Sequence, residues 1–290
     1  MSSVPCAPGG APGGAPGGPG TGRISFVGAG PGAADLITVR GAERLGRADI
    51  VVWASSLVPE ELLRHARAGA AIHDSKTMTL EDVLTVYAAN PAAEVVRLHS
   101  GDPSLYGAVQ EQIDWCVAND RPYELVPGVS SLGAAAAVLG RELTIPTVAQ
   151  SVVVTRLATR TTASMPDGES IGAYAATGCS LAVFLSAAQP EALQRELLAP
   201  PSAYRAGTPA AIVIRATWPD ETVVRTTVGH LAEDLRATGT TLTVLVLIGD
   251  FLDAGAHRSH LYSPDFAHTY RKRSLAGTTA GRPAGRSRPS

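Results

Sequence analysis

The sequence predicts an α/β protein of two consecutive α/β units, in which the first sheet is mainly parallel and the second sheet is mixed. From residue 23 to about residue 250, short runs rich in Val, Ile and Leu alternate with segments of helical character, the pattern of strands joined by crossover helices. Glycine-rich turns follow three of the strands, and Pro146 interrupts the chain between the two units.

The first unit holds five predicted strands. They lie at residues 24–27, 49–53, 71–73, 94–98 and 123–126. Helices are predicted at residues 38–47, 59–67 and 107–119. This alternation favours parallel pairing, because a parallel connection needs a crossover of about a dozen residues or more.

The second unit follows an Ala-rich helix predicted at residues 132–139. Its predicted strands lie at residues 152–155, 181–184, 211–214, 222–225 and 242–248, and its helices at 190–198 and 228–237. Residues 218–220, Trp-Pro-Asp, suit a hairpin that pairs Ile212 with Val223. The second sheet is therefore expected to be mixed.

Both ends of the chain differ from its body. Residues 1–22 hold 13 Gly or Pro residues and three copies of Ala-Pro-Gly-Gly, so we expect a disordered tail. Residues 256–290 carry seven Arg or Lys and one Asp among Gly, Pro, Ser and Thr, so we expect a second, basic disordered tail. The expected domains are residues 23–145 and 146–255.

Charge and hydropathy exclude several kinds of partner. The chain has a net charge of −2 and its C-terminal tail about +6, which leaves residues 23–255 at −8. We expect no nucleic-acid partner, because neutralising phosphates needs clustered Lys and Arg. No apolar run approaches the roughly 20 residues that span a bilayer, so we expect no membrane partner. Three distant cysteines and no visible secretory signal favour the cytoplasm.

Three glycine-rich turns follow strands of the first unit: GAGPGA at 28–33, SGDPSLYG at 100–107 and VPGVSS at 126–131. Ligands of parallel α/β sheets bind outside the carboxyl ends of the strands, and glycine lets a ligand approach the main chain. The three turns therefore predict one binding site. The first turn also matches a dinucleotide fingerprint, but no helix follows it directly and no acidic residue ends the second strand, which argues against NAD.

The segments FVGAGPGAADLIT at 26–38, GDP with LYG within 101–107, and VPGVSS at 126–131 resemble the signatures of the tetrapyrrole methyltransferases. These are S-adenosylmethionine enzymes of cobalamin and sirohaem synthesis. The segments WASSL at 53–57, RLHSGDPSLYG at 97–107 and QSVVVTR at 150–156 most resemble the members that methylate carbon 11 of precorrin-4 or of its cobalt-containing counterpart. The resemblance covers residues 23–252. It implies two α/β domains with S-adenosyl-L-methionine in the cleft between them, and a homodimer.

Matched position by position, the resemblance implies cofactor contacts that are largely backbone or apolar. They are Gly30, Pro31, Ser100, Gly101, Asp102, Leu105, Ser130, Ser131, Leu185 and Ala216. At Ser100, Leu185 and Ala216 the chain departs from the residues of many relatives. We expect binding to survive these changes, because contacts of this kind depend little on the side chain.

Methyl transfer from a sulfonium to a ring carbon depends on holding two molecules in orientation, and needs no protein nucleophile. The sequence shows no nucleophile with its base and no metal-ligand spacing, so no metal is expected, and the general base is left open. The acceptor carries several carboxylates, so Arg156 and Arg160 are candidates for binding it, although each singly fits a solvated loop arginine as well. Tyr106 is a candidate for lining the cleft.

Four alternatives remain open from the sequence. Two stay within the family: another ring-methylating member, or the diphthine synthase branch, which acts on a protein side chain. A third is a non-catalytic module that binds a nucleotide in the same cleft, which an assay of turnover would distinguish. The fourth, a nicotinamide oxidoreductase, lacks its acidic ribose-binding residue.

Overall fold

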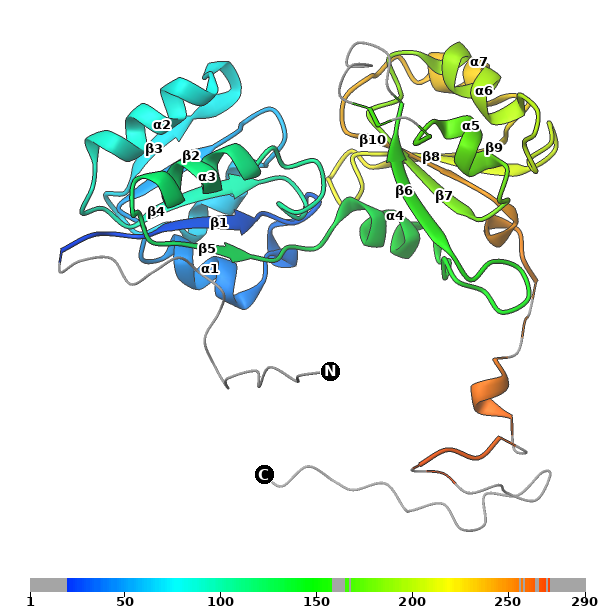
Figure 1. Ribbon diagram of the computed structural model, residues 1–290, viewed down its shortest axis with the longest axis horizontal. Helices are drawn as coiled ribbons and strands as arrows, with labels where there is room; N and C mark the ends of the chain where they lie inside the picture. Colours follow the sequence, from blue (N-terminus) through cyan, green and yellow to red (C-terminus); the bar gives the residue numbers. More distant parts are fainter. Residues whose placement is uncertain are drawn as a thin grey trace.

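The computed structural model describes residues 20–157, 165, 166, 168–255, 257, 259–263, 266–269 and 271. In this part of the chain two five-stranded sheets lie side by side, each with helices on its faces (Figure 1). The predicted fold of two α/β units is confirmed. Most of the two expected tails, and Arg160, lie outside the described residues.

The first sheet is entirely parallel, as predicted. Its strands are β1 (Ile24–Gly28), β2 (Ile50–Trp53), β3 (Ala71–Asp74), β4 (Val95–His99) and β5 (Tyr123–Val126). They lie in the order β3-β2-β4-β1-β5, so β1 and β4 are central. Both are almost wholly buried, which explains why most of their residues are apolar; the polar exceptions are Ser25 of β1 and Arg97 and His99 of β4.

Helical segments cover both faces of the first sheet. They are η1 (Ala34–Leu36), α1 (Val39–Leu45), η2 (Glu60–His65), η3 (Ser75–Thr77), α2 (Leu80–Ala89) and α3 (Gln110–Ala118), where η marks a 3-10 helix. Leu45 of α1 and Leu62 of η2 pack with Val96 and Leu98 on one face. On the other face α2 and α3 cover a cluster that includes Phe26.

The second sheet is mixed, as predicted. Its strands are β6 (Val152–Arg156), β7 (Ser180–Phe184), β8 (Pro209–Ile214), β9 (Thr222–Thr227) and β10 (Val244–Ile248), in the order β6-β7-β10-β8-β9. Only β6 and β7 are parallel to each other; the remaining neighbours are antiparallel. The β8–β9 hairpin is confirmed, but Ile212 is opposite Val224, one residue beyond the predicted partner.

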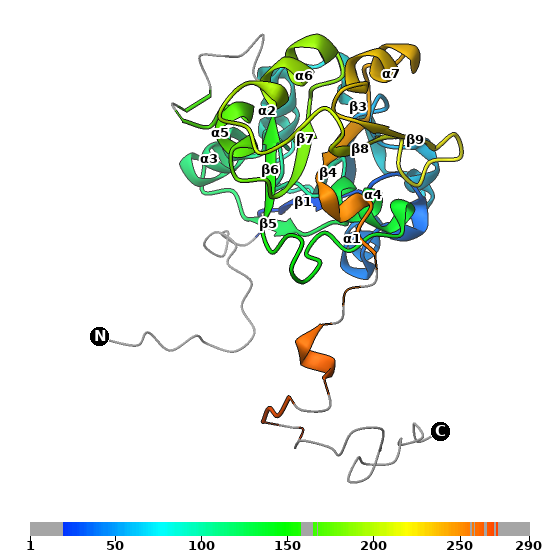
Figure 2. The ribbon, with the colours of Figure 1, turned by 90° about the vertical axis from the view of Figure 1, so that its right-hand side faces the viewer.

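Helices also cover both faces of the second sheet. They are α4 (Ser131–Leu139), α5 (Ile171–Ala175), α6 (Pro190–Leu198), α7 (Leu231–Ala237) and η5 (Asp250–Leu252), and η6 (His260–Tyr262) follows near the C-terminus. On one face α5, α6 and α7 pack together. The Ala-rich helix α4 packs with η5 on the other face, because Ala134, Ala135 and Leu139 fit closely against the strands. Figure 2 shows the two sheets stacked along the line of sight.

One helical prediction needs correction, and two helices were missed. The helix expected at residues 59–67 is the 3-10 helix η2, whose N–H groups bond three residues back, as Leu62 does to Pro59. The helices α2 and α5 were not predicted. The sequence does contain the start signal of α2, since Thr79 and Asp82 form a reciprocal capping box.

The carboxyl ends of the first sheet face the second sheet, as the arrowheads of β1 and β5 show (Figure 1). The turns that follow β1, β4 and β5 therefore lie between the two sheets. Within the described residues, no helix is both long and apolar enough to cross a bilayer.

Candidate functional site

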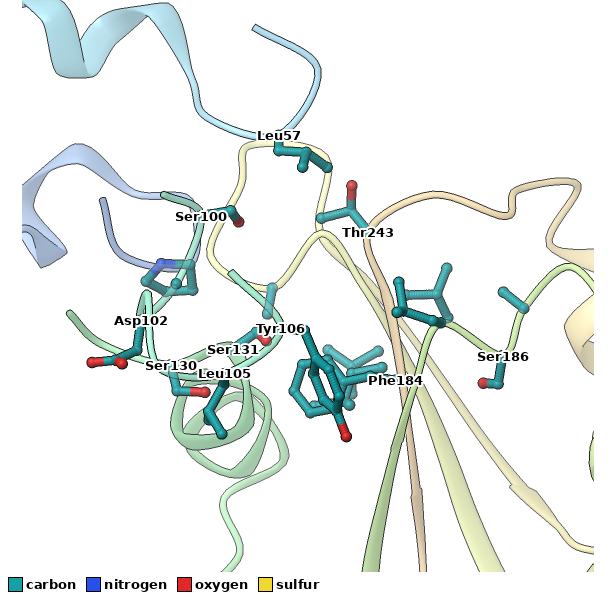
Figure 3. A pocket seen from close by; sticks show the side chains of 18 of the residues that line it. Leu57, Ser100, Asp102, Leu105, Tyr106, Ser130, Ser131, Phe184, Ser186 and Thr243 are labelled. Atoms are coloured by element: carbon teal, nitrogen blue, oxygen red, sulfur yellow. The ribbon is translucent and has the colours of Figure 1, made fainter. Parts of the chain in front are cut away.

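A cavity lies between the two sheets, at the carboxyl ends of β1, β4 and β5 (Figure 3). It holds about 950 Å³ of empty space, including open solvent at its mouth. Its lining consists of Pro31, Leu57, Ser100, Gly101, Asp102, Leu105, Tyr106, Ser130, Ser131, Phe184, Leu185, Ser186, Ala187, Val213, Ala216, Thr241, Thr243, Val244 and Leu245.

The three glycine-rich turns meet beside this cavity. Gly30 and Gly101 form an isolated antiparallel bridge, with N–H to O distances of 3.2 and 2.8 Å. A Cβ on Gly28 would lie 2.5 Å from the Cα of Gly128, and a Cβ on Gly128 would overlap the carbonyl oxygen of Gly101. Glycine is therefore required at Gly28 and Gly128 because the turns touch through their backbones.

The side chain of Asp102 joins two of these turns. One of its oxygens accepts the backbone N–H of Ser104 at 2.8 Å and the Ser104 hydroxyl, and the other accepts the backbone N–H of Gly128 at 2.9 Å. Partial burial opposes ionisation, but these hydrogen bonds hold the pKa of Asp102 below its ordinary value. In Figure 3 the carboxylate points away from Phe184 and Thr243. Asp102 thus holds the second and third turns together by accepting hydrogen bonds from their backbone N–H groups.

The first turn also docks onto the second sheet. The indole N–H of Trp218 donates to the carbonyl of Pro31 at 2.9 Å, and the N–H of Ala33 donates to the Thr217 hydroxyl at 3.0 Å. A Cβ on Gly32 would lie 2.6 Å from Nε1 of Trp218. These contacts hold the two halves of the cavity together, and the close approach explains the third glycine of the turn.

Unusual backbone conformations gather on the second-sheet side of the cavity. Leu185 and Thr243 line it with φ values of 51° and 56°, and Arg215 and Thr217 flank Ala216 with φ values of 49° and 68°. Non-glycine residues rarely adopt positive φ, and such strain concentrates at functional sites. The conformation also leaves Leu185 68% exposed at the cavity.

Tyr106 closes the cavity from the first-sheet side. Its φ is 56°, and the centroid of its ring lies 5.3 Å from that of Phe184. Figure 3 shows the two side chains next to each other in the cavity. Leu57, Leu105 and Tyr106 are also exposed apolar side chains in this lining. An exposed apolar cluster inside a cleft is typical of a ligand-binding site.

Arg156 ends β6 directly beside Phe184 of β7. Burial raises the pKa of the Tyr106 hydroxyl, and the nearby charge of Arg156 opposes that rise. Arg156 is therefore close to Tyr106 at the edge of the cavity, but is not part of the lining given above.

Of the ten expected cofactor contacts, all except Gly30 line the cavity, and Gly30 supports the lining through its bridge to Gly101. Several lining residues were not predicted, among them Phe184, Ser186 and Thr243. They carry no local motif, and only the packing of β7 and β10 brings them to the cleft. Among the described residues no group of three His, Cys, Asp or Glu side chains is arranged to hold a metal.

This arrangement suits a ligand that carries both polar and apolar groups. Ser100, Ser130 and Ser131 offer hydroxyls on the first-sheet side, where Leu105 adds apolar contact. Phe184 and Leu185 offer apolar contact from the second sheet. The site can hold and orient a small molecule, since the turns around it are fixed by hydrogen bonds and close packing.

Comparison with known proteins gives the same fold and a named family. The chain matches the family model of the tetrapyrrole (corrin/porphyrin) methylases over residues 23–232. A precorrin-4 C(11)-methyltransferase of a Sinorhizobium species is 44% identical over 253 residues, covering 86% of this chain and 98% of that protein.

Two solved structures are similar. An X-ray structure of a cobalamin biosynthetic enzyme, cobalt precorrin-4 methyltransferase, matches with a TM-score of 0.76 and 38% identity over 80% of this chain and 96% of that one. A uroporphyrin-III C-methyltransferase of Thermus thermophilus, complexed with S-adenosyl homocysteine, matches with a TM-score of 0.64 and 27% identity over 80% of this chain and 99% of that one. The chain belongs to the tetrapyrrole methylase family.

Proposed function

We propose that the cavity between the two sheets binds S-adenosyl-L-methionine as methyl donor. The observation that carries this proposal is that nine of the ten residues implied as donor contacts line one cavity. The uroporphyrin-III methyltransferase structure with bound S-adenosyl homocysteine supports it from a relative.

The residues of the cavity fit the chemistry of this donor. Ser130 caps α4 and Ser131 begins it, so the N-terminus of this helix lies at the cavity and favours the donor's carboxylate. The apolar side chains of Leu105 and Leu185 suit the adenine ring, and the hydroxyls of Ser100 and Ser131 suit polar groups.

We propose that the acceptor is precorrin-4 and that the enzyme transfers the methyl group to carbon 11, giving precorrin-5 in cobalamin synthesis. The 44% identity to a precorrin-4 C(11)-methyltransferase over nearly its full length supports this acceptor. The alternative is cobalt-precorrin-4, the substrate named for the similar X-ray structure. Because the cobalt ion is part of that substrate, metal-binding residues of the protein do not distinguish the two acceptors.

The role of the protein in this reaction is orientation. The sulfonium methyl is already activated, and the leaving thioether needs no proton. Rigid turns that hold donor and acceptor in line can contribute roughly 7–11 kcal/mol to lowering the barrier. We infer that Arg156 and Tyr106 contact the acceptor; their positions beside Phe184 support this assignment.

We also propose that the enzyme acts in the cytoplasm as a homodimer, as the family resemblance implies. The thiols of Cys116 and Cys179 are free and buried, which is compatible with a reducing compartment. Light scattering of the purified chain would measure the mass in solution; a monomer at all micromolar concentrations would contradict the dimer.

The function is tested with methyl-labelled S-adenosylmethionine, offering precorrin-4 and cobalt-precorrin-4 in separate reactions. We expect label in at least one of them, and the faster acceptor identifies the natural one. Binding of S-adenosylhomocysteine without transfer to either tetrapyrrole would contradict the proposed acceptor but not the donor site. No binding of S-adenosylhomocysteine would contradict both.

A further inference from the structure

A joint between the two domains lies beside the cavity, where the turn after β8 meets the first glycine turn. The indole N–H of Trp218 donates to the carbonyl of Pro31 at 2.9 Å. Beside it, the N–H of Ala33 donates to the Thr217 hydroxyl at 3.0 Å. Pro31 and Ala216, one from each domain, both line the cavity. These two hydrogen bonds therefore set how far apart the two walls of the cavity stand.

A charged side chain orients the indole ring of Trp218. The guanidinium carbon of Arg215 lies 4.2 Å from the centroid of this ring, which is a cation–π contact. The same guanidinium forms an ion pair with Asp220, in which Nη1 lies 2.9 Å from a carboxylate oxygen. These three side chains thus form a chain of contacts that ends at the carbonyl of Pro31.

The backbone at this joint is held by further hydrogen bonds. The N–H of Thr217 donates to the carboxylate of Glu221 at 2.6 Å. The N–H of Arg215 donates at 2.9 Å to the carbonyl of Thr243, another residue of the cavity lining. Arg215 and Thr217 both have positive φ values, which non-glycine residues keep only where their surroundings fix them. Ala216, which lies between them, therefore has a fixed place in the cavity wall.

The far side of the joint borders open space. A second cavity there, with about 1350 Å³ of empty space including open solvent, is lined by residues 32–35, 59–61 and 217–220, with Arg64 and Arg215. Trp218 is only partly buried, and it belongs to none of the buried apolar clusters of the described residues. The hydrogen bond to Pro31 and the contact with Arg215 therefore determine where the indole ring lies.

We propose that Trp218 is a positioning residue for methyl transfer: its indole N–H holds the Pro31 wall of the cavity at the right distance from the Ala216 wall, and Arg215 orients the indole. This inference rests on the proposed function, because it takes the cavity to be the donor site. Trp218 lines the second cavity and is not part of the donor cavity, so it acts through Pro31. A displaced Pro31 wall loosens the donor and misaligns its methyl group, and small misplacements of this kind slow a reaction strongly.

The test uses Trp218→Phe, which keeps an aromatic ring beside Arg215 and removes the indole N–H. Trp115→Phe is the matched control, since Trp115 lies on α3 of the first domain and outside both cavities. Arg215→Gln tests the contact that orients the indole. Its control is Arg236→Gln, which removes an exposed ion pair with Glu191 on the second domain. For each variant the Kd for S-adenosylhomocysteine, the kcat, the KM for each substrate and the melting temperature are measured.

We expect Trp218→Phe to raise the Kd for S-adenosylhomocysteine and the KM for S-adenosylmethionine roughly 2- to 10-fold, the loss of a neutral hydrogen bond. The kcat should fall, while the KM for precorrin-4 stays the same. Arg215→Gln should weaken S-adenosylhomocysteine binding on its own but not further in the Trp218→Phe background, because Arg215 acts through the indole N–H. Both controls should leave this Kd unchanged. If Trp218→Phe does not fold, the comparison of Arg215→Gln with Arg236→Gln decides the matter.

An unchanged Kd for S-adenosylhomocysteine in folded Trp218→Phe would overturn this inference and leave the proposed donor site standing. An equal loss of affinity from Arg215→Gln in the presence and absence of Trp218 would also overturn it, because Arg215 would then act independently of the indole. If the unsubstituted protein does not bind S-adenosylhomocysteine, the proposed donor site fails, and this inference fails with it.

Discussion

Asp102 accepts the backbone N–H of Gly128 at 2.9 Å, so a side chain of the second glycine turn holds the third turn in place. The bond spans 26 residues of sequence and joins the ends of β4 and β5, which are not neighbours in the sheet. The acidic residue of the GDP sequence is therefore explained by the assembly of the cavity wall.

We predict that Asp102→Ala weakens binding of S-adenosylhomocysteine about tenfold or more and lowers the free energy of unfolding by roughly 1–3 kcal/mol, because the N–H of Gly128 loses its acceptor. Calorimetric titration and urea unfolding measure the two effects. Ser104→Ala is the matched control, since it removes only a donor within the second turn and should cost less in both. Equal affinity in Asp102→Ala and the unsubstituted protein would refute this role.

Gly128→Ala should prevent the three turns from assembling. The added Cβ would overlap the carbonyl oxygen of Gly101 and lie 2.7 Å from the Cα of Gly28. We expect loss of S-adenosylhomocysteine binding and destabilisation by several kcal/mol, as for other severe backbone overlaps, about 4 or more. Gly133→Ala is the control: it lies in α4 with nothing within 4 Å, and alanine there should stabilise the helix by up to about 1 kcal/mol. Equal melting temperatures for the two variants would contradict the packing argument.

Arg156→Ala should raise the KM for the tetrapyrrole about tenfold, the lower end of the loss expected for a charged hydrogen bond, while the Kd for S-adenosylhomocysteine stays the same. The reason is its position beside Phe184, at the rim of the cavity and outside its lining. Arg195→Ala, on the exposed face of α6, is the control and should change neither constant. A change in the Kd for S-adenosylhomocysteine with no change in the KM for the tetrapyrrole would contradict this prediction, because it would show that Arg156 contacts the cofactor and not the acceptor.

The buried side chain of His99 should make the free energy of unfolding depend on pH. Burial, with a smaller contribution from the charge of Arg97, lowers its pKa to about 3, whereas an unfolded histidine titrates near 6.5. Between these values the unfolded chain binds a proton that the folded chain does not, so this contribution to stability is lost as the pH falls from about 6.5 towards 3, by about 1.4 kcal/mol per pH unit. Urea unfolding at pH 7, 6 and 5 should show a shallower slope for His99→Gln. Equal slopes of unfolding free energy against pH for His99→Gln and the unsubstituted protein would contradict the lowered pKa of His99.

The sequence allowed most strands and the three turns to be predicted, for a physical reason. Buried strands of a parallel sheet are rich in apolar residues, as β1 and β4 are apart from Ser25, Arg97 and His99, so their boundaries are visible without knowing their neighbours. The hairpin register was wrong by one residue because it depends on how the β8–β9 turn fits around Trp218, which also contacts Pro31 of the other domain.

The second-sheet side of the site was harder to predict. Phe184 and Thr243 reach the cavity only because β7 and β10 pair in one sheet, and no local motif marks them. The positive φ of Thr243, 56°, is likewise marked by no local motif.

Methylation of carbon 11 is tested most directly by supplying S-adenosylmethionine with a ¹³C-labelled methyl group, together with precorrin-4, and locating the label in the product by NMR. We predict a single labelled methyl group on carbon 11 and one equivalent of S-adenosylhomocysteine. A labelled methyl group on another ring carbon, or cofactor binding with no transfer, would contradict it.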